Sequence, residues 1–208
     1  MVRTASSKYT EQCFNNMKEI ILIGGGGHCK SVIDVIEQEN QFVIVGIVDK
    51  SELIGTDVLG YPVIGSDSDL ESLAKKYTYA LVTVGQIRSS EARIKLFNLA
   101  KKLGFSLPSI ISSRAYVSNH TFIGNGTVVM HDAFINAGAS IGDNCIINSK
   151  ALIEHDCKIS NHCHISTNAI INGSVTIEEG CFIGSGAVTN NSITIKKNSF
   201  IKAGSIAK

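Results

Sequence analysis

The segment AFINAGASIGDNCIINSKALIEHDCKIS, residues 133–160, decides the fold, because isoleucine returns at every sixth position within it. The same period runs from Val117 to Ile201, and each of its positions except Thr189 holds Val or Ile. Two residues before each of them stands a second residue, in most repeats Ala, Cys, Thr or Ser. A period of six suits neither an amphipathic helix nor a long strand. It is typical of a solenoid whose short strands each send one branched side chain inward before the chain turns a corner.

The residues between the repeated positions suit such corners. Gly, Asn and Asp are frequent there, and glycine adopts the backbone conformations of tight turns that most residues avoid. The β-branched residues at the repeated positions favour strands. Residues 109–208 are therefore predicted to form an all-β solenoid of hexapeptide repeats, with about five coils if three strands make one coil.

The register also places four cysteines in the small inward position. They are expected to be packed thiols in a reducing compartment rather than disulfides. Neighbouring histidines in this stretch face outward, so thiol and imidazole lie on opposite sides of the solenoid wall and cannot share one tetrahedral metal ion. We expect no metal site. The inward cysteines are Cys145, Cys157, Cys163 and Cys181.

The first half of the chain has a different pattern. Residues 1–16 are polar and aperiodic, and we expect a loose extension there. From residue 17 to residue 108, short apolar runs alternate with segments of helical spacing, which predicts an α/β domain with a parallel sheet covered on both faces. The predicted strands are residues 20–23, 42–48 and 80–85, and the predicted helices are residues 31–37, 69–76 and 89–103.

A run of four glycines followed by a histidine lies between the first predicted strand and helix. Successive glycines let backbone N–H groups approach a phosphate, and the start of the following helix favours negative charge. Cys29 replaces the last glycine of a strict G-x-G-x-x-G motif, so the loop alone does not establish a dinucleotide site. The residues are Gly24, Gly25, Gly26, Gly27 and His28.

Asp49 ends the second predicted strand. A carboxylate there would accept hydrogen bonds from a ribose or a base edge, but it would serve equally well to cap the end of the strand. We expect the side chains around Asp49 and Lys50 to select the base of any bound nucleotide.

Three ionisable residues, Glu154, His155 and Asp156, fill one predicted corner of the solenoid. A corner projects outward, so His155 would be accessible, and an accessible histidine is a suitable proton acceptor at neutral pH. An adjacent carboxylate orients the ring. The alternative is an ordinary solvated turn. Asn148 and His164 lie nearby in the sequence and favour a catalytic site, with His164 on the outward face of a strand, bordering a cleft between subunits. His162 is expected to be ordinary surface.

Composition excludes several classes of partner. The net charge is +1 and no Lys/Arg-rich block occurs, which argues against nucleic acid or an anionic membrane surface as partner. The longest apolar runs are too short to span a bilayer, and no signal segment opens the chain. A cytoplasmic location is therefore expected.

From residue 17 onward the sequence resembles a known family, the sialic acid O-acetyltransferase-like sugar acyltransferases. This family includes bacterial N-acetyltransferases of nucleotide-linked 4-amino-sugars, among them bacillosamine-pathway enzymes. The resemblance rests on ILIGGGGHCKSV at residues 21–32, GYPVIG at 60–65, ALVTVG at 80–85, IEHDC at 153–157 and HIS at 164–166.

The resemblance implies a Rossmann-like domain followed by a left-handed parallel β-helix. It further implies that His155 is the general base, that Asp156 is its acidic neighbour, and that Asn148 and His164 are active-site neighbours. The nucleotide sugar would lie on Gly24, Gly25, Gly26, Gly27, His28, Asp49 and Lys50. Acetyl-CoA, the co-substrate, would contact His164, Gly173, Phe182, Gly184, Ser185 and Ala203.

The family is trimeric, so the resemblance implies active sites between protomers. Two departures stand out: Cys29 replaces a usual Ala or Gly, and the chain ends AGSIAK without the common Gly-x-Pro-Ala-Lys tail. We expect an acetyl-CoA-dependent N-acetyltransferase of a nucleotide-linked amino sugar, a UDP-sugar being favoured. The alternatives are an O-acetyltransferase of sialic acid or a related sugar, and a trimeric scaffold without activity.

Overall fold

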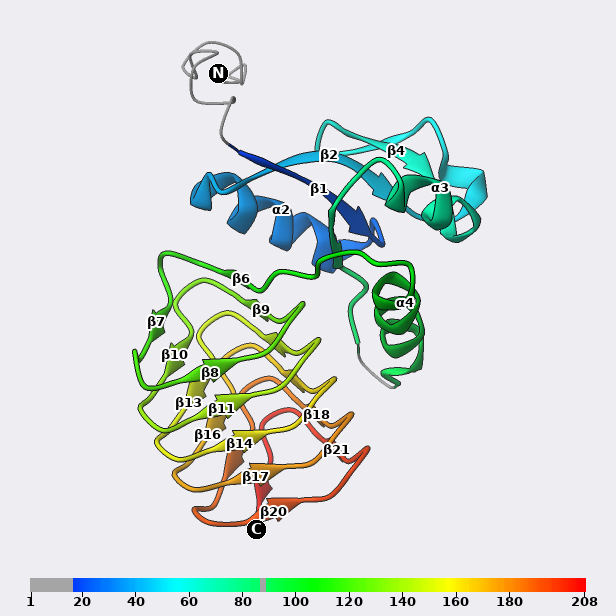
Figure 1. The fold of residues 1–208 in the computed structure, drawn as a ribbon. Coiled ribbons are helices and arrows are strands. Elements are labelled where there is room, and N and C mark those ends of the chain that lie inside the picture. The colour runs from blue at the N-terminus through cyan, green and yellow to red at the C-terminus, as the bar shows by residue number, and fades with distance from the viewer. Residues whose placement is uncertain (1–16, 87–88) are drawn as a thin grey trace, which may run out of the picture.

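The computed structural model describes residues 17–86 and 89–208, so the predicted extension 1–16 lies outside the described residues. An α/β domain sits at one end of a three-sided solenoid, and the C-terminus lies at the solenoid's other end (Figure 1). No helix in the described part of the chain is long and apolar enough to cross a membrane.

The α/β domain is built on a five-stranded sheet in the order β3-β4-β2-β1-β5. All neighbouring strands are parallel except β3 and β4, which form a short antiparallel hairpin. The strands are β1 (Lys18–Ile23), β2 (Phe42–Val48), β3 (Asp57–Val58), β4 (Tyr61–Gly65) and β5 (Tyr79–Val82). The helices are α2 (Gly27–Glu39), α3 (Leu70–Ala74) and α4 (Glu91–Lys102), with single 3-10 turns η1 (Ser51–Leu53) and η2 (Asp67–Asp69).

The three predicted strands and three predicted helices of this domain are confirmed, with several differences in extent; β5, for example, ends at Val82 rather than at residue 85. Helix α2 begins at Gly27, inside the glycine run, so that the loop between β1 and α2 is very short. Helix α3 is confined to five residues. The hairpin of β3 and β4 was not predicted, because neither strand is a long apolar run.

Burial on both faces explains the unbroken apolar sequence of β1. Ile20 and Leu22 pack with α2, whereas Ile21 and Ile23 pack with the side that carries α3 and α4. Because alternate residues of a strand point to opposite faces, covering both faces requires an apolar residue at every position.

The solenoid consists of two-residue strands that recur every six residues, as the sequence predicted, from β6 to β22. The repeat extends one strand beyond the predicted limits at each end. The strands are β6 (Ile110–Ile111), β7 (Tyr116–Val117), β8 (Phe122–Ile123), β9 (Val128–Val129), β10 (Phe134–Ile135), β11 (Ser140–Ile141), β12 (Ile146–Ile147), β13 (Leu152–Ile153), β14 (Lys158–Ile159), β15 (His164–Ile165), β16 (Ile170–Ile171), β17 (Thr176–Ile177), β18 (Phe182–Ile183), β19 (Val188–Thr189), β20 (Thr194–Ile195), β21 (Phe200–Ile201) and β22 (Ile206–Ala207).

Each strand pairs in parallel with the strand three positions later, which makes three flat faces. Face A contains β6, β9, β12, β15, β18 and β21; face B contains β7, β10, β13, β16, β19 and β22; face C contains β8, β11, β14, β17 and β20. We name the corners AB, BC and CA after the faces that they join in chain order. This is the hexapeptide-repeat β-helix of left-handed type, so the predicted fold class is confirmed.

The interior is filled by the repeated branched residues and the small residues beside them. The four cysteines predicted to face inward are buried and free of disulfides. Thr189, the exception in the repeat, is also buried, and its Oγ1 accepts a hydrogen bond of 2.9 Å from the backbone N–H of Asn172. A polar group at this inward position is therefore satisfied by the corner beside it.

The corners repeat one strained backbone conformation. In most coils the last residue of each corner has a positive φ, which non-glycine residues rarely adopt. Asp156 at corner BC and Asn144 at corner CA, with φ of 60° and 53°, are examples. Asn, Asp and Gly tolerate this conformation best, which explains their frequency between the repeats.

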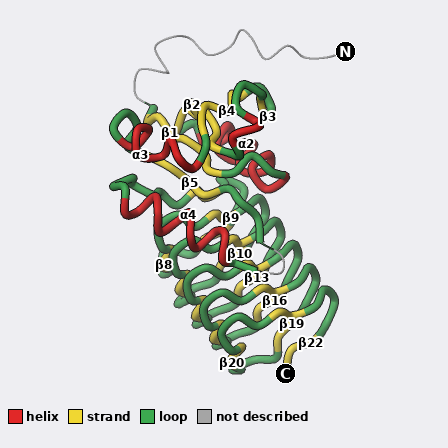
Figure 2. Tube along the Cα trace, turned by 90° about the vertical axis from the view of Figure 1, so that its right-hand side faces the viewer, coloured by secondary structure: helices red, strands yellow, loops and turns green. Residues whose placement is uncertain are grey.

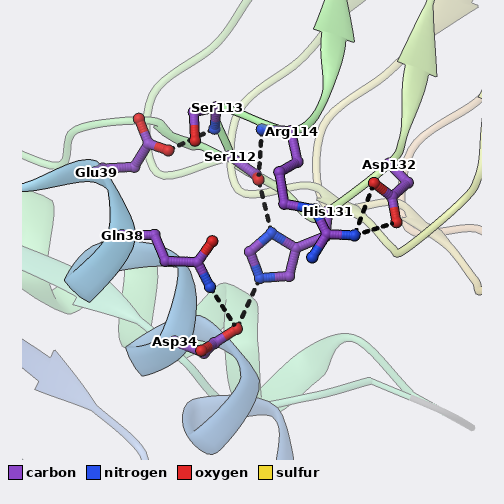
Figure 3. A network of polar contacts seen from close by, with 8 residues as sticks. All are labelled: Asp34, Gln38, Glu39, Ser112, Ser113, Arg114, His131 and Asp132. Atoms are coloured by element: carbon purple, nitrogen blue, oxygen red, sulfur yellow. Dashed lines mark hydrogen bonds and ion pairs between the residues drawn. The ribbon is translucent and has the colours of Figure 1, made fainter.

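Helix α2 of the α/β domain packs against the first coils of the solenoid and so forms the contact between the two domains. Ile110, Val128 and Met130 of the first coils belong to the same apolar cluster as α2. A polar rim surrounds this contact: His131 Nε2 lies 2.8 Å from Asp34 Oδ2, and its Nδ1 lies 2.7 Å from Ser112 Oγ (Figure 3). The junction is thus both packed and hydrogen-bonded.

Helix α4 lies along corner CA of the upper coils (Figure 2). The ring of Phe97 packs against Gly126 in one coil and edge-on to His162 at a centroid distance of 5.7 Å. Between them, Arg93 Nη2 donates to Asn144 O at 2.6 Å and to Asn144 Oδ1 at 2.9 Å. The helix therefore covers three successive coils at one corner.

We predict that Ile177→Ala lowers the free energy of unfolding by about 2–5 kcal/mol, because Ile177 is fully buried and the cavity left in a closed prism cannot collapse. The matched control is Thr176→Ala, the outward neighbour in the same strand. Denaturant unfolding measures both variants. A similar effect of the two changes would contradict the inward assignment of the isoleucines.

Candidate active site

Corner BC carries an exposed histidine paired with a carboxylate. His155 Nδ1 lies 2.8 Å from Asp156 Oδ2, and 57% and 66% of these side chains are exposed. Because a carboxylate is an acceptor, it orients the ring with Nδ1–H toward Asp156 and leaves Nε2 as the proton acceptor. Glu154 is not hydrogen-bonded to His155; instead its Oε2 accepts a hydrogen bond of 2.8 Å from Asn136 Nδ2.

Two glycines give this pair the room that it occupies. A Cβ on Gly173, in the next coil, would lie 2.7 Å from His155 Nε2, and its φ is not in the left-handed region. A Cβ on Gly138, in the preceding coil, would lie 2.5 Å from Asp156 Oδ1. Real Cβ atoms do not approach other atoms this closely, so a side chain at either position would displace the pair. At position 173 it is the imidazole, and not a left-handed backbone, that favours glycine.

A second group of predicted residues gathers on face A and corner AB. His164 is buried, with its Nδ1 2.8 Å from the backbone oxygen of Gln86 and its Nε2 3.3 Å from Asn148 Nδ2. Burial and the nearby Arg93 lower the pKa of His164 to about 4, although the hydrogen bond to Gln86 opposes them. His164 is therefore neutral at physiological pH. It lies on the outward face as predicted, but Gln86 covers it.

The residues expected to bind acetyl-CoA divide between face A with corner AB and, for Gly173, corner BC. Phe182 contacts His164 edge-on, with ring centroids 5.1 Å apart, and stacks on Phe200 at 5.0 Å. Ser185 Oγ lies 2.9 Å from Ser166 Oγ at corner AB. The next coil leaves no room for a Cβ on Gly184, which would lie 2.4 Å from Ala203 N. Gly173, in contrast, lies with His155 at corner BC.

The expectation for His162 was wrong. Its side chain is buried under α4, where Phe97 packs on the ring and Asn144 Nδ2 lies 3.0 Å from Nδ1. Burial lowers the pKa of His162. The repeat correctly predicted that His162 lies in a turn. It could not predict that a helix distant in the sequence covers this turn.

A cavity of about 490 Å³ opens at the carboxyl ends of the parallel strands in the α/β domain. Ligands of open α/β sheets bind at this edge. Of the residues predicted for the nucleotide sugar, Gly24, Asp49 and Lys50 line the cavity. Gly26 and Gly27 are exposed at the start of α2, with open space where a Cβ would be.

Asp49 ties the glycine loop to the end of β2. Its Oδ2 accepts a hydrogen bond of 2.5 Å from Gly25 N, and its Oδ1 accepts one of 2.7 Å from Lys50 N. A Cβ on Gly25 would lie 2.8 Å from the same Oδ2. The capping interpretation of Asp49 is thus confirmed, and the side chain faces the cavity as well.

His28 is held away from this cavity. Its Nε2 is buried and, within the described residues, has no hydrogen-bond partner. Burial, with smaller contributions from Arg93 and His164, lowers the pKa of His28 to about 3. His28 thus lies in the polar region between the glycine loop and face A.

Two buried polar residues of this region were not singled out from the sequence, Gln86 and Arg93. Arg93 lies on the buried side of α4, where the spacing of the helix called for an apolar residue. An arginine at a position where an apolar residue is expected was the signal in the sequence for this buried polar region. Among the described residues, no group of three or more His, Cys, Asp or Glu side chains is arranged to hold a metal ion.

Comparison with family models gives two matches. The PglD N-terminal domain matches residues 19–98, and the bacterial transferase hexapeptide repeat matches residues 120–155 and 156–191. Together they span most of the chain. The chain belongs to the hexapeptide-repeat sugar acetyltransferases. A search of curated proteins gave no significant match.

Several solved structures are similar to about nine tenths of this chain. The acetyltransferase domain of PglB from Neisseria gonorrhoeae is 31% identical, with a TM-score of 0.85 over 92% of this chain and 91% of that one. PerB from Caulobacter crescentus, solved with CoA and GDP-perosamine, is 34% identical, with a TM-score of 0.86 over 91% and 88%. WeeI from Acinetobacter baumannii is 25% identical, with a TM-score of 0.81 over 92% of each chain.

We predict that Gly173→Ala lowers the acetyl-transfer rate of this acetyltransferase by about 100-fold, because the new methyl group displaces the His155 ring by the order of 1 Å. The melting temperature should change little, since the φ of Gly173 suits alanine. Steady-state kinetics and thermal unfolding measure the two effects. An unchanged rate would show that the ring is not used where it lies.

Proposed function

We propose that the chain transfers the acetyl group of acetyl-CoA to the amino group of a nucleotide-linked 4-amino-deoxy-sugar. A UDP-sugar is the favoured acceptor, and the product would serve the synthesis of bacterial surface glycans or glycoproteins. The observation that carries this proposal is the exposed His155–Asp156 pair seated against Gly173. The similarity to PerB, solved with CoA and GDP-perosamine, supports a nucleotide-linked amino sugar as acceptor.

In this reaction His155 acts as the general base. The sugar amine attacks the thioester carbonyl, and His155 Nε2 accepts its proton while Asp156 stabilises the resulting imidazolium. The new C–N bond forms first and gives a tetrahedral intermediate, whose collapse breaks the C–S bond. The coenzyme A thiolate then leaves and takes up the proton that His155 accepted. The inward cysteines are buried, so no acyl-enzyme is formed through them.

The oxyanion of the tetrahedral intermediate needs a donor close to His155. The backbone N–H of Gly173 is suited to this role, because it adjoins the ring and donates to no group within the described residues. Donors of this kind contribute on the order of 3 kcal/mol to the rate.

The cavity of the α/β domain would hold the nucleotide. Exposed backbone at Gly26 and Gly27, at the start of α2, suits the diphosphate. Asp49 and Lys50 lie where a base or ribose would be bound at the edge of the sheet. Acetyl-CoA and a nucleotide sugar as substrates fit the cytoplasmic location expected from the sequence.

A homotrimer is part of the proposal, and the outer surface of face B supports it. The outward residues of face B are all apolar and aligned from coil to coil, whereas those of face C are polar from Ser140 onward. The residues toward the two ends of this row are exposed and the three central ones are half-buried, and aligned apolar surface of this kind is typical of interfaces. The row consists of Tyr116, Phe134, Leu152, Ile170, Val188 and Ile206.

Burial of face B between copies would also complete the active site. Face B is bounded by corner BC, which carries His155, and by corner AB, which carries Asn148 and Ser185. One copy's corner BC would meet a neighbour's corner AB and face A. The two groups of predicted residues that a single chain keeps apart would then line one groove for acetyl-CoA.

We predict that His155→Ala lowers turnover by about 100-fold or more, because the amine loses its proton acceptor. The matched control is His120→Ala, an exposed histidine at the same corner two coils earlier. The rate of acetyl transfer is measured from the appearance of the coenzyme A thiol. Near-normal turnover in the His155 variant would overturn the proposed role of this residue.

The acceptor is identified with a panel of UDP-, GDP- and dTDP-linked 4-amino-sugars alongside free sialic acid. Acetylation of a nucleotide-linked amine, with a rise in melting temperature on binding of the matching nucleoside diphosphate, is expected. Acetylation of sialic acid alone would instead establish the O-acetyltransferase, and no turnover with any acceptor would favour the scaffold.

We predict that Ile170→Glu, at the centre of face B, converts a trimer to monomers and abolishes turnover, because three charges would be buried without partners. Thr194→Glu, on the polar face C, is the matched control and should stay trimeric. Light scattering after size-exclusion chromatography measures the mass. A monomeric wild-type chain with full activity would contradict the shared site.

A further inference from the structure

The protonation of His164 is determined by a backbone group. Nδ1 lies 2.8 Å from the carbonyl oxygen of Gln86, and a carbonyl oxygen can only accept. Because burial lowers the pKa of His164 to about 4, its ring carries a single proton at neutral pH. That proton is on Nδ1, and Nε2 is left as an acceptor.

The orientation of Asn148 follows from a second backbone group. The N–H of Ser149 donates to Asn148 Oδ1 at 2.8 Å, which identifies the oxygen of that amide. Its nitrogen therefore faces His164 Nε2, at 3.3 Å. One N–H of the Asn148 amide donates to His164, and the other makes no hydrogen bond within the described residues. The chain Gln86–His164–Asn148 thus has one consistent set of proton positions.

Gln86 is held in place by its own side chain. Only 2% of it is exposed, and its Nε2 donates to the backbone oxygen of Gly180 at 3.3 Å. Its Oε1 is buried and has no partner in the described part of the chain. A buried acceptor without a partner destabilises a fold, so stability alone does not explain a glutamine here.

Gln86 also belongs to a segment that contacts the glycine loop and leads into the helix docked on corner CA. Just before it, Thr83 Oγ1 donates to Gly24 O at 2.6 Å, and Val84 packs against Gly24 so closely that a Cβ there would lie 2.4 Å from its Cγ2. Just after it, α4 anchors to the solenoid through Arg93 and Asn144. The position of Gln86 is therefore linked to the glycine loop and to corner CA.

We propose that Gln86 is a positioning residue for acetyl transfer, which holds His164 as the Nδ1–H tautomer. The second N–H of Asn148 is thereby directed into the groove proposed above for acetyl-CoA. This inference rests on the proposed function. In that groove, the Asn148 N–H would donate to an amide or thioester oxygen of acetyl-CoA. If His164 adopted the other tautomer, two donors would face each other and the amide would turn away.

The tautomer is measured directly, without substrate, on the full chain labelled with 15N-histidine. We expect His164, assigned by loss of its signals in His164→Gln, to show a protonated Nδ1 and an unprotonated Nε2 at pH 7. In Gln86→Met the signals should shift toward a mixture of tautomers. A protonated Nε2 in the wild-type protein would overturn the inference.

The kinetic test uses the same variant. Gln86→Met nearly preserves the volume and removes the donor to Gly180, a single hydrogen bond of 3.3 Å, so the melting temperature should change little. We expect kcat to fall about tenfold, with little change in KM for the nucleotide sugar. Lys95→Ala, at an exposed position of α4, is the matched control and should behave as wild type.

The outcomes separate this inference from the proposed function. If the wild-type protein acetylates a nucleotide amino sugar and Gln86→Met has normal kcat, only the role of Gln86 is wrong. If the wild-type protein acetylates nothing, the proposed function fails, while the tautomer of His164 remains measurable. Should Gln86→Met be unstable, Gln86→Leu, whose side chain also lacks the donor, must reproduce both the tautomer change and the kcat loss.

Discussion

Stacking of the inward isoleucines is the constraint on which the rest of the structure depends. Residues eighteen apart, such as Ile147, Ile165 and Ile183, lie over one another and fill the prism. A shift of the register by a single residue would turn every side chain to the other side of the wall. The same register that buries isoleucine therefore puts His155 at a corner and seals the cysteines inside.

Steric room, as much as charge, shapes the His155–Asp156 pair. The imidazole and the carboxylate each lie where the Cβ of a glycine in an adjacent coil would be, at Gly173 and Gly138. Adjacent coils thus leave room for the pair, whose two side chains are hydrogen-bonded to each other and largely exposed. In a rigid solenoid this arrangement requires no loop to order before reaction.

The sequence allowed the solenoid, its register, the inward cysteines and the exposure of His155 to be predicted, because all follow from a local period. It did not allow the surroundings of His162 and His164 to be predicted. These two residues differ from other outward positions only in being covered, by α4 and by Gln86. That cover depends on how an amphipathic helix far away in the chain docks on a corner. Sequence spacing carries no information about such docking, and a buried arginine on α4 was the one hint.

The outer edges of β20, β21 and β22 pair with no other strand among the described residues. Lysine is concentrated in this coil, at Lys196, Lys197, Lys202 and Lys208. Positive charge along a strand edge repels a second edge of the same kind. The lysines of this coil therefore disfavour strand pairing between this edge and the same edge of another copy.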